Sequence, residues 1–103
     1  MIVEIVTFDL PFGTDRGAAL ELYRQTAARW LANPDLAGKY YFFDEQRCLG
    51  GGVYIWPSSE AAAHWHGPEY RHMIKSRYGS MPRIETFDAL IHIDPRSGRS
   101  MEL

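Results

Sequence analysis

Residues 39–56 read KYYFFDEQRCLGGGVYIW, in which two runs of aromatic and β-branched residues are separated by a polar stretch and three glycines. Runs of this kind predict two strands, Lys39 to Phe43 and Val53 to Trp56, that pair as an antiparallel hairpin. Three consecutive glycines within a strand pattern indicate a bulge, or a place where another backbone or a ligand comes close. The stretch therefore predicts a β-hairpin in the middle of the chain.

Strand and helix patterns flank this hairpin on both sides. The predicted order is strand, helix, strand, strand, helix, strand, over residues 2–8, 16–33, 39–43, 53–56, 58–78 and 84–94. The first helix has apolar residues at three- and four-residue steps and ends at Asn33-Pro34, and the second is broken at Gly67-Pro68. We expect a single domain over residues 1–94 and a polar C-terminal tail over residues 95–103.

This order is the split βαβ arrangement, an α+β fold with an antiparallel sheet and both helices on one face. Because strand side chains alternate, Tyr41 and Phe43 can face the helices only if Tyr40 and Phe42 face away. In the strand over residues 53–56, likewise, either Val53 and Ile55 or Tyr54 and Trp56 face the helices. Two helices cannot cover both apolar faces of such a sheet, so the sequence predicts a homodimer that forms through the sheet faces.

The composition excludes several classes of partner. The 103 residues include 11 Lys and Arg against 13 Asp and Glu, and a net charge of −2 does not favour nucleic acid or anionic lipid. No apolar run approaches the roughly 20 residues of a membrane-spanning helix, so no membrane partner is expected. Glu4 and Asp9 interrupt the N-terminal apolar stretch, unlike a signal peptide. Cys48, the single cysteine, cannot form an intrachain disulfide, which predicts a reducing, cytoplasmic location.

Several short motifs in the second half of the chain match a known group of proteins. They are Gly51-Gly52-Val53-Tyr54-Ile55-Trp56, Ser58 with Glu60-Ala61-Ala62, Pro68-Glu69-Tyr70-Arg71, Arg77-Tyr78-Gly79, Pro82 and Phe87-Asp88. The sequence thereby resembles the YdhR-like branch of the dimeric α+β barrel superfamily, which includes the antibiotic biosynthesis monooxygenases. The resemblance implies a ferredoxin-like protomer, paired through its sheet into a barrel, with a ligand pocket between sheet and helices. Enzymes similar in fold oxidise polycyclic phenols or anthrones with molecular oxygen, without a metal or flavin.

Histidines and aromatic residues gather around the predicted helix break. An imidazole there could remove a proton from a phenol or a C–H group, and a tyrosine could hydrogen-bond to the ligand. His64 and His66 lie about 200° apart on a regular helix, so at most one is expected to act. The resemblance favours His66, and we expect His66 and Tyr70 to be catalytic. Six further residues are expected to bind the substrate: Trp30, Tyr41, Phe43, Trp56, Trp65 and His72.

No cofactor and no metal ion are expected. Glu69 and His72 have the Glu-x-x-His spacing of di-iron proteins, but a second such pair and further helical carboxylates are missing. The favoured interpretation is a cofactor-independent monooxygenase that oxidises a small aromatic or polycyclic phenolic metabolite with O2. The alternative is a non-catalytic dimer of the same fold, which binds a small hydrophobic ligand or uses its aromatic residues only to build a core.

Overall fold

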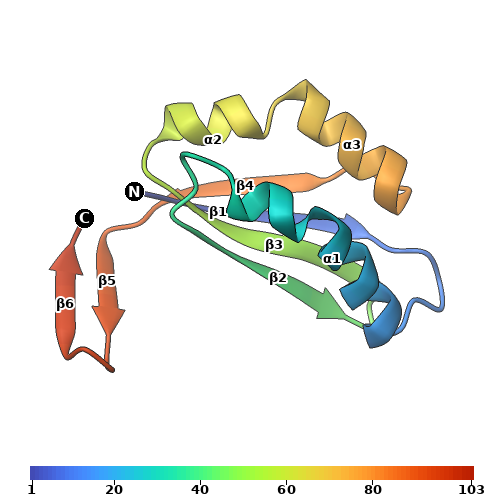
Figure 1. Cartoon of the computed structure of the whole chain (residues 1–103), viewed down its shortest axis with the longest axis horizontal. Helices are drawn as coiled ribbons and strands as arrows, with labels where there is room; N and C mark the ends of the chain where they lie inside the picture. The colour runs from blue at the N-terminus through green and yellow to red at the C-terminus, as the bar shows by residue number, and fades with distance from the viewer.

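The computed structural model describes all residues from 1 to 103. Its elements are β1 (Ile2–Asp9), α1 (Arg16–Leu31), β2 (Gly38–Asp44), β3 (Leu49–Trp56), α2 (Ser59–Trp65), α3 (Pro68–Tyr78), β4 (Arg83–Asp88), β5 (Ile91–Asp94) and β6 (Arg99–Glu102). Four strands form an antiparallel sheet in the order β2-β3-β1-β4, and the helices lie together on one face of it (Figure 1). The predicted α+β, ferredoxin-like protomer is thereby confirmed.

Local signals in the sequence set the ends of the helices. The Asp15 side chain accepts a hydrogen bond from the Ala18 N–H at the start of α1, and Ser58 caps α2 in the same way. Pro68 occupies the first turn of α3, where its missing N–H is not needed. Gly79 follows α3 with a φ of 91°, in the left-handed region that glycine adopts without strain. None of the helices has the length and apolar character to cross a membrane.

The register of the sheet decides which strand side chains face the helices. Tyr54 on β3 pairs with Lys39 on β2 and with Glu4 on β1, and residues paired in this way point to the same face. Tyr54 is only 2% exposed, so this is the face that the helices cover. Alternation adds Tyr41 to the covered face and leaves Tyr40 on the other, where it is 78% exposed.

The three glycines of β3 make room for neighbouring side chains. A Cβ at Gly50 would overlap the Tyr23 hydroxyl of α1. That hydroxyl donates a hydrogen bond to the Phe42 carbonyl (2.8 Å) and accepts one from the Gly51 N–H (3.2 Å). A Cβ at Gly51 would overlap the Val6 carbonyl oxygen, so no larger residue fits there. The close approach predicted for the glycines is therefore made by a tyrosine of the same chain.

Aromatic rings fill the layer between the sheet and the helices. Phe8 of β1 stacks on Tyr78 of α3 with ring centroids 4.2 Å apart, and Tyr23 of α1 stacks on Tyr41 of β2 at 4.5 Å. Trp56 at the end of β3 is fully buried. Rings of this size each bury a large apolar area and hold the helices on the sheet.

The C-terminal part of the chain differs from the prediction. The sequence predicts one strand over residues 84–94, but β4 ends at Asp88 and the chain leaves the sheet at Ala89-Leu90. Asp88 pairs with Ile2, the first residue of β1, so β4 has no neighbouring strand beyond this point. The next residues instead form β5, which pairs with β6. The expected polar tail therefore supplies the turn and second strand of a hairpin that stands away from the main sheet (Figure 1).

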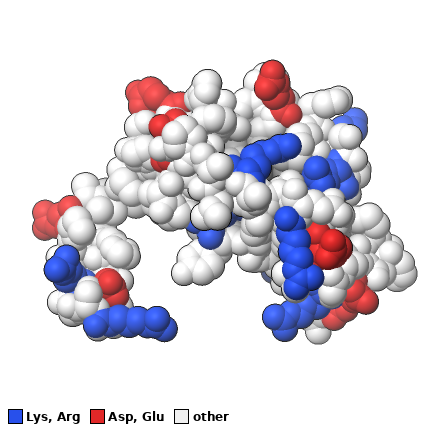
Figure 2. Space-filling view, in the orientation of Figure 1, with Lys and Arg blue, Asp and Glu red and all other residues white.

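The face of the sheet opposite the helices is uncovered in the single chain. It contains half-buried β-branched residues, together with Tyr40 and Phe87, which are largely exposed. The β5–β6 hairpin also exposes apolar side chains, namely Ile91, Ile93 and Met101. Charges of both signs are interspersed over the side seen in Figure 2, and they extend onto the separate hairpin.

Candidate active site

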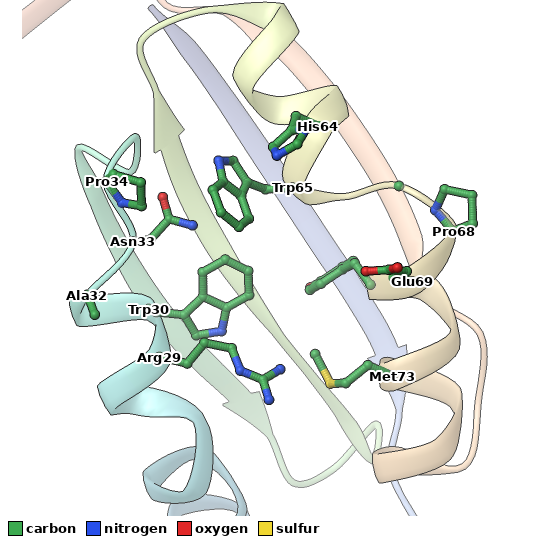
Figure 3. Close-up of a pocket in the computed structure, with 12 residues that line it drawn as sticks. Arg29, Trp30, Ala32, Asn33, Pro34, His64, Trp65, Pro68, Glu69 and Met73 are labelled. Carbon is green, nitrogen blue, oxygen red and sulfur yellow. The ribbon is translucent and has the colours of Figure 1, made fainter.

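An open cleft with a volume of about 920 Å³ lies between the C-terminal end of α1 and the junction of α2 and α3. Trp30 and Asn33 form one wall, and Trp65, Tyr70 and Met73 belong to the other. Figure 3 shows the rings of Trp30 and Trp65 lying toward one another across this space. The helix break at Gly67 therefore opens a cleft rather than only kinking a helix.

Two contacts define the shape of the cleft. The Trp65 indole N–H donates a 2.8 Å hydrogen bond to the Asp35 carboxylate, which ties α2 to the loop after α1. The rings of Trp30 and Tyr70 meet edge to face, with centroids 5.9 Å apart and planes at 74°. Arg29 and Glu69 add one charge of each sign to the lining. The cleft thus has aromatic walls and a few polar groups, as small-molecule sites commonly do.

The floor of the cleft separates it from a small interior space. Trp30, Tyr70 and Met73 line both, so these three side chains form the partition. On the inner side lie Lys39 and Tyr54 of the sheet. The interior space has a volume of only about 10 Å³, so it is filled by side chains and takes no ligand.

Lys39 lies in an aromatic cage on this inner side. Its Nζ is 4.3 Å from the ring centroid of Trp30, 3.9 Å from that of Tyr41 and 4.2 Å from that of Tyr54. It is hydrogen-bonded to the Tyr54 hydroxyl at 2.8 Å, and that hydroxyl is 2.9 Å from the hydroxyl of Tyr70. No carboxylate forms an ion pair with Lys39. Burial lowers the pKa of Lys39 to about 6, so at neutral pH its amine is mostly uncharged.

Burial acts on the two tyrosine hydroxyls in the opposite direction. It raises the pKa of Tyr54 well above its ordinary value, and the neighbouring Tyr70 hydroxyl raises it further. Burial also raises the pKa of Tyr70, against the lowering effect of its hydrogen bond with Tyr54. Both hydroxyls therefore keep their protons at neutral pH and can donate hydrogen bonds.

A second polar cluster surrounds Glu4 on the other side of Tyr54. The Glu4 carboxylate accepts hydrogen bonds from the indole N–H of Trp56 (3.2 Å) and the hydroxyl of Thr86 (3.0 Å). It is also paired with Nδ1 of His66, which is 5% exposed. Nε2 of His66 is buried without a hydrogen-bond partner. Burial lowers the pKa of His66, and the hydrogen bond to Glu4 opposes this shift only in part.

The structure brings together some of the residues singled out in the sequence and separates others. Trp30, Trp65 and Tyr70 line the cleft, and Tyr41 lines the interior space behind it. His66 lies directly behind Tyr70, with ring centroids 4.0 Å apart, but it does not reach the cleft. The remaining three residues expected to bind substrate lie outside the cleft lining: Phe43, Trp56 and His72.

Each of these three residues has a physical reason for its place. Trp56 is held in the core by its hydrogen bond to Glu4. Phe43 packs against the core farther along β2. His72 is exposed and borders a shallow depression between α1 and α3, because it lies on a different side of α3 from Tyr70.

Sequence reasoning missed Glu4 and Lys39, two charged residues of the helix-covered face that lie beside Tyr54. Each stands in a strand at a position where alternation requires an inward side chain: Glu4 lies between Ile2 and Val6, and Lys39 has the parity of Tyr41. A charged residue at such a position is rare unless it is paired or functional, which is the signal that could have revealed them. No group of three or more histidine, cysteine or acidic side chains comes close enough to hold a metal ion.

The sequence matches no family model and no curated protein. Solved structures do match. A candidate antibiotic biosynthesis monooxygenase from Caulobacter crescentus is 20% identical, with a TM-score of 0.64 over 86% of this chain and 89% of its own. A monooxygenase from Streptomyces coelicolor in complex with the ligand nanaomycin D is 16% identical, with a TM-score of 0.66 over 91% of each chain.

A third similar structure is that of a variant of SnoaB, a cofactor-independent oxygenase from Streptomyces nogalater. It is 12% identical, with a TM-score of 0.60 over 85% of this chain and 91% of its own. Identities this low establish the fold and leave the reaction open. The chain therefore has the fold of the antibiotic biosynthesis monooxygenases, and the narrower resemblance to the YdhR-like branch stays a prediction.

Proposed function

We propose that this chain is a cofactor-independent monooxygenase that oxidises a small aromatic or polycyclic phenol bound in the cleft. One observation carries the proposal. The cleft has two tryptophan walls, and Tyr70, which also lines it, belongs through its hydroxyl to a buried network of hydrogen-bonding groups. An aromatic substrate could stack on Trp30 or Trp65 while its hydroxyl meets Tyr70. The fold that this chain shares with oxygenases supports an oxygenase reaction, but a shared fold does not by itself establish the reaction.

The reaction begins with loss of a proton from the substrate. The resulting phenolate is electron-rich and transfers electrons to O2, which forms a carbon-oxygen bond and gives a hydroperoxide after protonation. Loss of water then yields a quinone, so one oxygen atom enters the product and the other leaves as water. The substrate supplies all the electrons, and the protein needs to bind the phenol, promote its ionisation and exclude water.

We assign Tyr70 as the hydroxyl that contacts the substrate and His66 as its support. His66 packs against the Tyr70 ring and is fixed by Glu4, so it acts as a positioning residue in this proposal. Arg29 on the cleft wall could attract an anionic oxygen of the substrate. Trp30 and Trp65 supply the apolar surface on which a planar ring would stack.

We also propose that the chain forms a homodimer through its open sheet face. Alternation leaves this face mostly apolar, with Tyr40 78% and Phe87 49% exposed, and the β5–β6 hairpin, which stands away from the sheet, exposes further apolar residues. A second copy would cover a face of the same composition, as twofold dimers do. Light scattering after size exclusion should give twice the chain mass, and Tyr40→Glu should reduce it to the single-chain mass.

The experiment for the oxygenase proposal is O2 uptake by chelator-treated protein with a panel of anthrones, hydroquinones and polycyclic phenols. Saturable uptake should occur with the wild type and fall at least about tenfold in Trp30→Ala and Tyr70→Phe. His72→Ala is the matched control, because His72 lies outside the cleft. Uptake that is unchanged in both cleft variants would contradict the proposed site.

A second candidate function is binding of an aromatic ligand without catalysis. It is favoured by one observation: His66, the histidine expected to be catalytic, does not line the cleft, and the histidine that does is His64. Ligands of the same panel should then raise the melting temperature of the wild type, and of Trp30→Ala much less, while no O2 is consumed.

A further inference from the structure

We infer that Tyr70, Tyr54 and Lys39 form a proton path, along which an acidic phenol or enol in the cleft gives its proton to the Lys39 amine. This inference rests on the proposed function, because it names the base and the substrate class of the same site. It assigns Lys39 a catalytic part although its side chain lies behind the cleft floor.

The hydrogen bonds are continuous from Tyr70, a residue of the cleft wall, to the amine. Tyr70 lines the cleft, and its hydroxyl is 2.9 Å from that of Tyr54, which is 2.8 Å from Lys39 Nζ. Both distances are those of good hydrogen bonds. Tyr54 is 2% and Tyr70 6% exposed, so water does not interrupt the path within the protein. A substrate hydroxyl at Tyr70 would complete a chain of three donors that ends on a nitrogen lone pair.

The proton balance follows from the order of the groups. The substrate O–H donates to the Tyr70 oxygen, Tyr70 passes its own proton to the Tyr54 oxygen, and Tyr54 passes its proton to Lys39. The two tyrosines end as they began, the substrate becomes an anion, and the amine becomes an ammonium ion. No oxidant or reductant is needed for this step, so it precedes the reaction with O2.

The surroundings of Lys39 suit a base that gains charge only during the reaction. Burial keeps the resting amine uncharged, with a pKa of about 6. The three rings around Nζ then stabilise the ammonium ion through their faces. The titratable groups that face this region are the hydroxyls of Tyr41, Tyr54, Tyr70 and Tyr78, and none of them is an anion at neutral pH. Arg29 of α1 and Arg77 of α3 add positive charge near Tyr41. The charge of Lys39 also acts across Tyr54 on His66.

A weak base of this kind selects its substrates by acidity. Proton transfer to Lys39 is efficient only when the substrate is about as acidic as the ammonium ion that forms. Ordinary phenols are much weaker acids. Phenols and enols conjugated to a carbonyl, nitro or quinone group meet the requirement, and the cleft should therefore ionise these in preference to simple phenols.

Other acceptors compete with Lys39. His64 and Glu69 line the cleft, but no hydrogen bond joins either side chain to Tyr70. His66 lies behind the cleft floor, and its geometry is also less favourable. It contacts Tyr70 by ring packing, and no hydrogen bond joins the two residues. Its Nδ1 is occupied by Glu4, and its Nε2 has no hydrogen-bond partner. Lys39 is connected to Tyr70 through a hydroxyl, whereas His66 is not.

The test uses 4-nitrophenol under argon, because its phenolate absorbs visible light and no oxygen chemistry occurs. The pH at which the bound probe ionises is measured in the wild type, Lys39→Met, Tyr54→Phe and His66→Gln. Lys75→Met is the matched control, since Lys75 is exposed on α3 and the chain has only these two lysines. We expect the bound probe to ionise about one pH unit lower in the wild type and Lys75→Met than in Lys39→Met and Tyr54→Phe.

Any other result of the ionisation measurement overturns the inference. Equal ionisation of the bound probe in all variants would exclude Lys39 as the acceptor, and a loss confined to His66→Gln would assign the proton to His66. Failure of the wild type to bind the probe would show that the cleft does not accept a phenol of this kind. Because the measurement needs no O2, ionisation that depends on Lys39 without O2 uptake would refute the oxygenase and retain the proton path. O2 uptake that is unaffected by Lys39→Met would refute the proton path and retain the oxygenase.

Discussion

Glu4 and Lys39 lie in one row of the sheet, on either side of Tyr54, and their surroundings are opposite. The Glu4 carboxylate has three partners, in Trp56, Thr86 and the His66 ring. Lys39 has one hydroxyl and the faces of three rings, and no negative charge. The buried Glu4 is thus fully satisfied, and the half-buried Lys39 is held in a form that is ready to accept a proton.

The difference separates a structural role from a chemical one. A buried carboxylate with full hydrogen bonding fixes its neighbours, and here it fixes His66 behind Tyr70. A buried amine without a counter-ion destabilises the fold and is retained where its reactivity is used. Stability and reactivity should therefore respond in opposite ways when the two residues are replaced.

The largest effect is expected at Glu4. Glu4→Ala removes the partner of the buried Trp56 and His66 rings and of the Thr86 hydroxyl, so the free energy of unfolding should fall by about 3–5 kcal/mol. Urea unfolding followed by tryptophan fluorescence measures it. Glu45→Ala is the control, because Glu45 is exposed in the turn between β2 and β3 and its replacement should change stability by no more than about 0.5 kcal/mol. Similar values for both variants would contradict the role given to Glu4.

Lys39→Met should act in the opposite direction. It keeps the length of the side chain and removes an amine that must lose its proton on burial, so stability at neutral pH should rise by about 2–3 kcal/mol. The same unfolding measurement applies, with Lys75→Met as control. A loss of stability in Lys39→Met would mean that the amine forms favourable contacts in the folded protein and is not an uncharged base.

The pH dependence of stability sharpens this prediction. The pKa of Lys39 is about 6 in the folded protein and that of an ordinary lysine in the unfolded chain. Between these values the unfolded chain binds more protons, so the free energy of unfolding rises with pH and falls as the pH is lowered toward 6. This rise of the free energy of unfolding with pH should be absent in Lys39→Met. Unfolding curves at several pH values above 6 measure it, and an equal slope in both proteins would refute the assignment.

A smaller effect is expected for Tyr54→Phe, which removes the hydroxyl between the two residues. The ring and its packing remain, but Lys39 and Tyr70 each lose a hydrogen-bond partner, so stability should fall by about 1–2 kcal/mol. Tyr40→Phe, on the open face, is the matched control. A double-mutant cycle with Lys39→Met should show coupling between residues 39 and 54, and additivity would count against the contact.

The smallest effect is expected at the rim of the cleft. Trp65→Phe removes an exposed hydrogen bond to Asp35, so stability should fall by no more than about 0.5–1 kcal/mol. Binding of an aromatic ligand should weaken more than stability does, because Trp65 forms part of the cleft wall. Equilibrium binding of 4-nitrophenol and thermal unfolding together separate the two effects. Equal losses of binding free energy and of unfolding free energy would argue against Trp65 as part of the cleft wall.

Much of the fold could be predicted from the sequence because local signals and alternation agree. The aromatic runs around the glycines predict the central hairpin, and Gly67-Pro68 predicts the helix break. Where β4 ends could not be predicted, because that depends on β1 beginning at Ile2. The pairing of β5 with β6 likewise depends on the absence of any other neighbouring strand.

The candidate site was only partly accessible from the sequence. Tyr70 and Trp65 stand next to the helix break, and their aromatic character marked them as cleft residues. Lys39 and Glu4 lie in strands far apart in sequence, and only the register places both beside Tyr54. The position of His66 behind Tyr70 could not be seen either, because it depends on the pairing of His66 with Glu4 across the sheet and helix layers.

The titration of Lys39 tests most directly whether its amine is a buried base. With lysine labelled by 13C at Cε, the spectrum contains two signals, and the one missing in Lys39→Met belongs to Lys39. The shift of this signal should report a pKa of about 6 for Lys39, and Tyr54→Phe should change that value. A signal that titrates at the high pH of an ordinary lysine would show a permanently charged ammonium ion, and Lys39 could not then accept a proton.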